Sequence, residues 1–147
     1  MSYPYLSYSV GTTTTSTVTY ASSDVIGSLT QLPNISRDGF IQGVTILTRG
    51  ATTTGQIDVL IFNSSMPNST FTDNSAIAIS SQDYANVVTA IHVTDWTAMG
   101  TPSVGLSNGL AYAYSISGST AYFCMVARAA ISLASSNGMT TTFNMVV

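Results

Sequence analysis

The chain contains no lysine and no glutamate, and its charged residues are three arginines and six scattered aspartates. Charged residues make up 6% of the 147 positions, whereas an average soluble domain has roughly 25%. General acid-base catalysis draws mainly on His, Glu, Asp, Lys and Tyr. Here there is one histidine, His92, and no two aspartates lie closer than ten positions in the sequence. We therefore expect a protein that is not an enzyme.

The shortage of basic residues also bears on partners. Arg37, Arg49 and Arg128 are far apart in the sequence, whereas binding to a phosphate backbone depends on clustered Lys and Arg. No apolar run reaches the ~18 residues of a membrane span, because Arg128 interrupts the longest one. The N-terminus lacks the basic and apolar regions of a signal peptide. These absences predict no nucleic-acid partner, no membrane partner, and synthesis and retention in a cytoplasm until assembly.

The sequence also has few residues that could bind a metal ion or a cofactor. Cys124 is the single cysteine, so neither an intrachain disulfide nor a multi-cysteine metal site is available. Its apolar neighbours predict a small buried hydrophobe. His92 alone offers too few ligands for a metal site, and no Gly-rich phosphate loop or G-x-S-x-G motif occurs. We expect no cofactor, with a Ca²⁺ site through Asp73 and loop carbonyls as a lesser alternative.

Hydroxyl side chains take the place of the missing charges. The chain has 22 serines and 22 threonines, and 45% of its residues are hydrophobic. The hydrophobic content is enough to bury a core, and a hydroxyl-rich surface suits neutral protein contacts or glycans. Monomeric surfaces normally carry about 25–35% charged residues. The composition therefore predicts a subunit of a larger assembly.

Short β-branched and aromatic segments, separated by Gly, Ser, Asn and Pro, dominate the chain. They predict a single-domain all-β fold, an antiparallel β-sandwich or jelly roll with at most one short helix. The domain spans 12–147, and 1–11 forms an extended N-terminal arm or, with equal support, an edge strand. The predicted strands are Thr12–Tyr20, Asp24–Leu29, Gly39–Thr48, Gln56–Phe62, Val87–Thr94, Ser103–Leu106, Leu110–Ser117, Ala121–Ala129 and Thr140–Val147.

Some segments support finer predictions. In Gly39–Thr48, Phe40 shares a face with Val44 if the strand is regular, but Gly43 indicates a bulge or a close backbone approach. Gln56–Phe62 is apolar on both faces, which is typical of a central strand or a subunit interface. Leu110–Ser117 and Ala121–Val126 resemble a hairpin that turns at Gly118 with a positive φ. Ser80–Val87 predicts a short helix, capped by Ser80 and by Asp83 in a capping box.

Three regions are candidates for contact with a partner. The tyrosine-rich N-terminus offers large side chains with polar tips, and a loop ordered by Pro67 and an Asp-Asn pair suits surface contacts. Trp96 is either a core plug, which we favour, or an interface anchor. The candidate residues are Tyr3, Pro4, Tyr5, Tyr8, Phe71, Thr72, Asp73, Asn74 and Trp96.

A resemblance covers the stretch from Gly39 to Trp96, about 40% of the chain. It consists of the strand end Leu60-Ile61-Phe62, the loop residue Pro67, the signature Phe71-Thr72-Asp73-Asn74 and the acidic turn at Asp83. In these features the sequence resembles a family of small structural proteins of tailed bacteriophages. The resemblance implies a virion component such as a capsid decoration or cement protein, which in such phages is often a β-rich oligomer on capsid junctions.

Together these observations favour a non-enzymatic virion protein. The leading hypothesis is a homotrimeric decoration or cement subunit that binds the major capsid protein on the capsid surface and bridges neighbouring subunits. One alternative is a carbohydrate-binding receptor or adhesion module of a phage tail or fibre, which exposed Trp96, Tyr112 or Tyr114 on one concave face would favour. The other is a self-assembling fibre or sheath subunit, which would form open-ended polymers.

Overall fold

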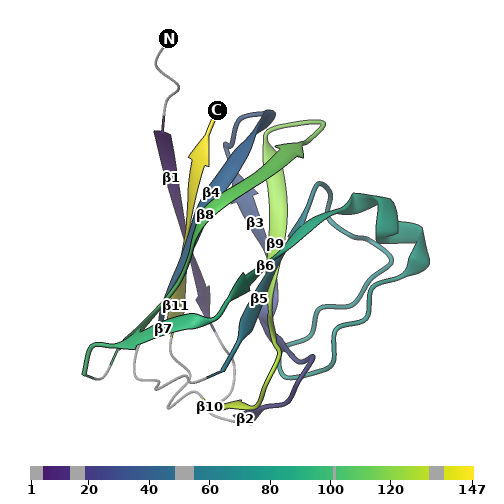
Figure 1. The fold of residues 1–147 in the computed structure, drawn as a ribbon. Helices are drawn as coiled ribbons and strands as arrows, with labels where there is room; N and C mark the ends of the chain where they lie inside the picture. The colour runs from purple at the N-terminus through teal and green to yellow at the C-terminus, as the bar shows by residue number, and fades with distance from the viewer. Residues whose placement is uncertain (1–4, 14–18, 49–54, 101, 133–137) are drawn as a thin grey trace.

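Two antiparallel sheets pack face to face in the computed structural model, which describes residues 5–13, 19–48, 55–100, 102–132 and 138–147 (Figure 1). The predicted all-β sandwich is confirmed. The elements are β1 (Tyr5–Thr13), β2 (Thr19–Tyr20), β3 (Val25–Pro33), β4 (Asp38–Thr48), β5 (Ile57–Phe62), the 3₁₀ helix η1 (Ser81–Asn86), β6 (Val87–Val93), β7 (Asp95–Ala98), β8 (Ser103–Ser115), β9 (Thr120–Ala127), β10 (Ile131–Ser132) and β11 (Gly138–Val146).

The five-stranded sheet has the order β1-β11-β4-β8-β7, and the four-stranded sheet has the order β3-β9-β5-β6. β2 and β10 form a small separate pair. Side chains alternate along the strands, so β11 buries Met139, Thr141, Phe143 and Met145 while the residues between them face outward. Phe143 meets Phe123 of β9 edge to face, with ring centroids 5.0 Å apart, and this contact joins the two sheets at the core.

β5 is buried on both faces along its whole length, and it lies between β9 and β6. The predicted central strand is therefore confirmed. Its inner face belongs to the main core, and its outer face supports a second hydrophobic cluster that includes Leu60, Phe62 and Met66. The chain between β5 and β6 lies over this outer face, because Met66 and Phe71 of that connection pack there.

The Gly43 bulge is confirmed, and it changes which residues of β4 face the core. Pairing between β4 and β8 moves from Ile41 opposite Tyr112 to Gly43 opposite Asn108, and Gly109 in the longer β8 segment has φ +70°. Before the bulge the odd-numbered Ile41 is buried, and after it the even-numbered Val44 is buried. Phe40 therefore faces away from the core, opposite to its position in a regular strand. β8 also runs continuously through the two strands predicted at Ser103–Leu106 and Leu110–Ser117.

The predicted hairpin between β8 and β9 is wrong. β8 pairs with β4 and β7, whereas β9 pairs with β3 and β5, so the connection crosses from one sheet to the other. Ile116 donates its backbone N–H to the Arg37 carbonyl, and Gly118 does not have a positive φ. Alternating apolar residues suit a hairpin and a crossing between stacked sheets equally well, so the pattern could not distinguish them.

The short helix is η1. Ser80 is its N-cap, as predicted, and the Ser80 hydroxyl accepts a hydrogen bond from Gln82 N. The capping box is wrong, since the Asp83 side chain is buried and bonds to Asn68 and Ser69 instead. Loop donors compete successfully for this carboxylate because they lie on the side of η1 that faces the protein.

From Tyr5 onward the N-terminus forms an edge strand, which is one of the two alternatives that the sequence left open. β1 pairs with β11 over nine consecutive residues from Tyr5 opposite Val146 to Thr13 opposite Gly138, and Figure 1 shows the two strands side by side. Tyr3 and Pro4 lie outside the described residues. Two short strands, β7 and β10, were not predicted.

Candidate docking surface

The outer faces of the two sheets differ. The chain's own 63–86 connection covers the four-stranded sheet, whereas no described segment covers the five-stranded sheet. The strands of the five-stranded sheet contain two aspartates, Asp38 and Asp95, and no basic residue. We call this uncovered side the open face. Its outward side chains include Tyr5, Ser7, Ser9, Thr140, Thr142, Asn144, Val146, Asp38, Phe40, Thr45, Leu47, Val104, Leu106, Ala113, Asp95 and Thr97.

An apolar row crosses one end of the open face. Strand register places Tyr5 opposite Val146, Val146 opposite Phe40, and Phe40 opposite Ala113, so the four residues lie side by side on β1, β11, β4 and β8. Tyr5 is 75% exposed and Phe40 is 50% exposed. Grouped exposed apolar side chains of this kind mark contact sites on soluble proteins.

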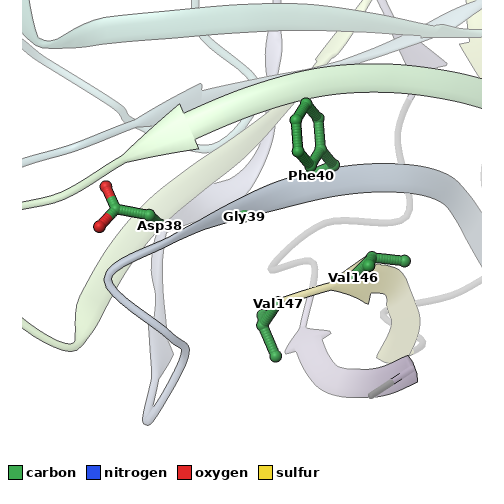
Figure 2. Close-up of a pocket in the computed structure, with 5 residues that line it drawn as sticks. All are labelled: Asp38, Gly39, Phe40, Val146 and Val147. Atoms are coloured by element: carbon green, nitrogen blue, oxygen red, sulfur yellow. The ribbon is translucent and has the colours of Figure 1, made fainter. Parts of the chain in front are cut away.

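A pocket of about 360 Å³ lies beside this row, where the start of β4 meets the end of β11. Figure 2 shows its lining residues, Asp38, Gly39, Phe40, Val146 and Val147. The Asp38 carboxylate is the one charged side chain of this lining. The pocket therefore suits an apolar side chain of a partner.

Farther along the open face, hydroxyls and amides replace the apolar residues. The Ser7 hydroxyl donates to Asn144 Oδ1 at 2.8 Å, and the Ser9 and Thr142 hydroxyls are 2.9 Å apart. Ser7 and Ser9 are exposed, Thr142 and Asn144 are half-buried, and all four are already bonded across the strands. They give this part of the open face an uncharged surface with donors and acceptors for a partner.

Tyr114 lies on the inner side of the sheet, beneath the pocket. Its side chain is buried, and its hydroxyl has no hydrogen-bond partner among the described residues. Burial is the main cause that raises the pKa of Tyr114, and the neighbouring Tyr8 and Asp38 add to it. A Cβ on Gly39, its cross-strand neighbour, would lie 2.8 Å from the Tyr114 hydroxyl and 2.6 Å from the Val146 carbonyl. Glycine at 39 is therefore required for this packing.

The predicted loop candidates hold the covering segment in place. Asp73 Oδ1 accepts hydrogen bonds from the Tyr20 hydroxyl at 2.9 Å and from Gly27 N at 2.7 Å. Phe71 packs edge to face on Phe62, with centroids 5.5 Å apart. Thr72 and Asn74 are exposed, and the Asn74 N–H donates to the Val25 carbonyl. These four residues are brought together, but on the side of the sandwich opposite the open face.

Asp83 anchors the same segment. It accepts hydrogen bonds from Asn68 N at 2.9 Å, from Asn68 Nδ2 at 3.2 Å and from the Ser69 hydroxyl at 2.6 Å. The bond from Ser69 has the largest influence on the pKa of Asp83, and together with the bonds from Asn68 it outweighs burial and lowers the pKa. An ionised carboxylate thus closes the loop.

The remaining aromatic candidates lie at the core margin. Trp96 is half-buried and packs on the main core, and its ring lies against the backbone of Gly105. Trp96 Nε1 has no hydrogen-bond partner in the described part of the chain. Tyr8 also packs on the core, and its hydroxyl donates to the Asn34 carbonyl at 3.0 Å. Of the predicted contact residues that are described, Tyr5 is therefore the one on the open face.

Sequence reasoning missed a cluster around Asp58. This carboxylate, 3% exposed, accepts hydrogen bonds from His92 Nδ1 at 2.7 Å, from Gln56 Nε2 at 3.0 Å and from Arg128 Nε. Burial alone would raise the pKa of Asp58, but the bonds from His92, Arg128 and Gln56 and the charge of Arg128 outweigh it, and the net pKa is lowered. The signal for this cluster is that Asp58 and His92 lie opposite each other on neighbouring strands. This signal can be used only when the strand pairing is known.

Within the described ranges, no group of three or more His, Cys, Asp or Glu side chains is placed to hold a metal ion. Cys124 is fully buried, and burial raises its pKa to about 12. In the same part of the chain, no helix has the length and apolar character to cross a membrane.

Comparisons with known proteins give fold likenesses only. No family model and no curated protein match the chain. Among solved structures, it is similar to a chain of the cyanophage Pam1 capsid asymmetric unit, at 11% identity and a TM-score of 0.43, covering 97% of this chain and 84% of that one. It is also similar to a chain of the native virion of Kashmir bee virus, at 10% identity and a TM-score of 0.39, covering 96% and 70%. A chain of Desmodium yellow mottle tymovirus matches at 8% identity and a TM-score of 0.31, covering 100% and 88%. At these TM-scores the likeness is one of general shape alone.

Proposed function

We propose that this chain is a non-enzymatic structural subunit of a virion, which decorates the capsid and stabilises it by bridging neighbouring capsid subunits. The observation that carries the proposal is the open face. The chain's own 63–86 connection packs on one sheet through side chains such as Met66 and Phe71, while the other sheet presents a broad surface with two aspartates, no basic residue on its strands and an apolar row at one end. The partner implied by the sequence resemblance is the major capsid protein.

The protein would stabilise the capsid by holding neighbouring capsid subunits together. A ligand that binds the assembled shell better than free subunits stabilises the shell through linkage, and several weak contacts on one oligomer gain through effective concentration. With two aspartates and no basic residue on its strands, the open face would bind through apolar burial and neutral hydrogen bonds. Such binding is only weakly sensitive to salt, because screening acts on charges.

The geometry gives less support to the carbohydrate-binding alternative. Tyr114 is buried, and Trp96 and Tyr112 are half-buried against the main core. The three aromatics named for a sugar platform therefore do not form an exposed one.

The test is binding of the purified protein to virus particles that lack it, followed by electron cryo-microscopy. Phe40→Asp should reduce co-sedimentation with the particles about tenfold or more, as expected when an aromatic anchor of an interface is lost. Tyr84→Asp is the matched control, since Tyr84 is 63% exposed on η1, on the covered side; it should bind as the wild type does.

Particles without the protein should also release their genome at lower temperature, and density on the capsid should disappear. Equal heat resistance, with the protein found on tails or fibres, would contradict the capsid role. If both Asp variants bind normally, the open face is not the docking surface.

A further inference from the structure

The four edge strands of the two large sheets, β1, β7, β3 and β6, are protected to different degrees. Unpaired edge strands are templates for pairing with another chain, and natural sheets discourage this with short strands, charges, prolines and bulges. β3 ends in Pro33, and its pairing with β9 shifts between Ile26 and Thr30. β7 has four residues and begins with Asp95. β6 has a register shift at its start and leads through Thr94 directly into the other sheet.

β1 has none of these features. It pairs with β11 over nine residues without a register shift, and Tyr5–Thr13 contains neither a charged residue nor a proline. Three of its inner positions are hydrophobic, because Tyr8 and Val10 pack on the main core and Leu6, which is 36% exposed, lies on the same side of the strand at the margin. Its outer side chains at Ser7 and Ser9 are polar and exposed. The free edge of β1 is therefore regular, neutral and incompletely covered.

We infer that β1 pairs antiparallel with β1 of a second copy of this chain, about a twofold axis at Tyr8. This pairing joins the two five-stranded sheets into one continuous sheet and places two open faces side by side. The inference does not depend on the proposed function, because the pairing would form in solution. It makes the unit a dimer, in place of the trimer expected from the sequence.

Side-chain matching favours a second copy as the occupant. Around Tyr8, Leu6 faces Val10 of the partner copy, and Ser7 faces Ser9 of the partner copy, so apolar residues meet apolar ones and polar residues meet polar ones. An axis at Ser9 would place Leu6 opposite Thr12 instead. In a symmetric antiparallel pair, a charged residue at the twofold axis would lie opposite the same charged residue of the partner copy. β1 contains no charged residue, so this repulsion does not arise.

The first measurement is the solution mass of the full chain, by light scattering or sedimentation. We expect twice the 15.3 kDa of the monomer. Ser7→Lys combined with Ser9→Lys places like charges opposite one another across the axis and should give a monomer that keeps the wild-type circular dichroism. Ala111→Lys combined with Ala113→Lys adds the same charge at exposed positions of β8 and should leave the dimer intact.

The second measurement tests the register by disulfide formation. Directly opposite residues have Cα atoms about 4.5–5.5 Å apart, within the range of a disulfide. A mixture of Ser7→Cys and Ser9→Cys proteins should give a covalent dimer after mild oxidation, whereas either protein alone should not. The native Cys124 is buried and should not compete.

A monomeric or trimeric wild-type mass would overturn the inference. A dimer that persists in the Ser7→Lys, Ser9→Lys variant would overturn it too. Cross-linking by either single-cysteine protein alone would overturn the axis at Tyr8. A dimer that is lost on Ser7→Lys with Ser9→Lys, with cross-links only in the mixture, establishes it. Particle binding is not used in these measurements, so failure here leaves the proposed function standing.

Discussion

Asp58 and His92 are cross-strand neighbours on β5 and β6, and His92 Nδ1 lies 2.7 Å from Asp58 Oδ1. An ionised carboxylate only accepts hydrogen bonds, so Nδ1 carries the proton. Arg128 and Gln56 donate to the same carboxylate. A buried anion is costly unless it is paired and hydrogen-bonded. Three side chains meet that requirement here: Arg128 after β9, Gln56 before β5 and His92 on β6.

Asp58→Asn should lower the free energy of unfolding by about 1–3 kcal/mol, the cost of disrupting hydrogen bonds to a buried charged group. The His92 and Arg128 side chains are 60% and 35% exposed, so the released donors can reach water and the loss stays below that of a fully buried ion pair. Urea denaturation followed by fluorescence measures the change. Asp95→Asn, at an exposed position of β7, should change stability little. An equal loss in both variants would contradict the structural role of the cluster.

Acid should destabilise the protein through the same carboxylates. The pKa values of Asp58 and Asp83 are both lowered in the folded state. A depressed folded pKa gives stability that is complete above the unfolded value of about 3.9 and is lost as pH falls toward the folded pKa. The stability that these two carboxylates contribute should therefore stay nearly constant down to about pH 5. Below about pH 4 it should be lost, and the urea midpoint should fall. Asp58→Asn should flatten that fall, and an unchanged slope would argue against the lowered pKa of Asp58.

Gly39→Ala should destabilise the fold by about 1–3 kcal/mol, the usual range for overpacking. The new methyl would lie 2.6 Å from the Val146 carbonyl, so backbone must move at the junction of β4 and β11. Gly118→Ala is the control, because a Cβ there meets nothing within 4 Å and the residue does not have a positive φ. Thermal unfolding of both variants measures the difference, and equal melting temperatures would refute the close approach.

Tyr114→Phe should leave stability unchanged or raise it by up to about 1 kcal/mol, because it removes a buried hydroxyl that lacks a hydrogen-bond partner among the described residues. Tyr8→Phe should instead lower stability by about 0.5–1.5 kcal/mol, since its hydroxyl donates to the Asn34 carbonyl. Chemical denaturation of the two variants gives the comparison. A larger loss for Tyr114→Phe would show that its hydroxyl has a partner.

Cys124 should not react with a water-soluble thiol reagent in the native protein. Burial raises its pKa to about 12, and only the thiolate is the nucleophile. In denaturant, where the ordinary pKa of about 8.5 applies, one thiol per chain should react promptly. Rapid reaction of the native protein would mean that β9 opens on the time scale of the assay.

Several features of this protein were evident in the sequence. Regular alternation with Gly and Pro punctuation indicates the all-β sandwich, and the two apolar faces of Gln56–Phe62 indicate a central strand or a subunit interface, of which β5 is the central strand. Ser80 is recognisable as a cap, and Gly43 as a bulge or a close backbone approach. These features depend on residue types within a few positions, so local preferences of the chain were sufficient to predict them.

Tertiary structure decided the rest, because pairing between distant strands cannot be deduced from alternation. It placed β8 and β9 in different sheets, it turned Phe40 outward through the Gly43 bulge, and it directed Asp83 to the 63–86 loop. It also brought Asp58, His92 and Arg128 together from positions as far as 70 residues apart. The sequence by itself determined a hydroxyl-rich sandwich with few charged residues, whereas the open face and the free β1 edge exist only because of the order in which the strands pair.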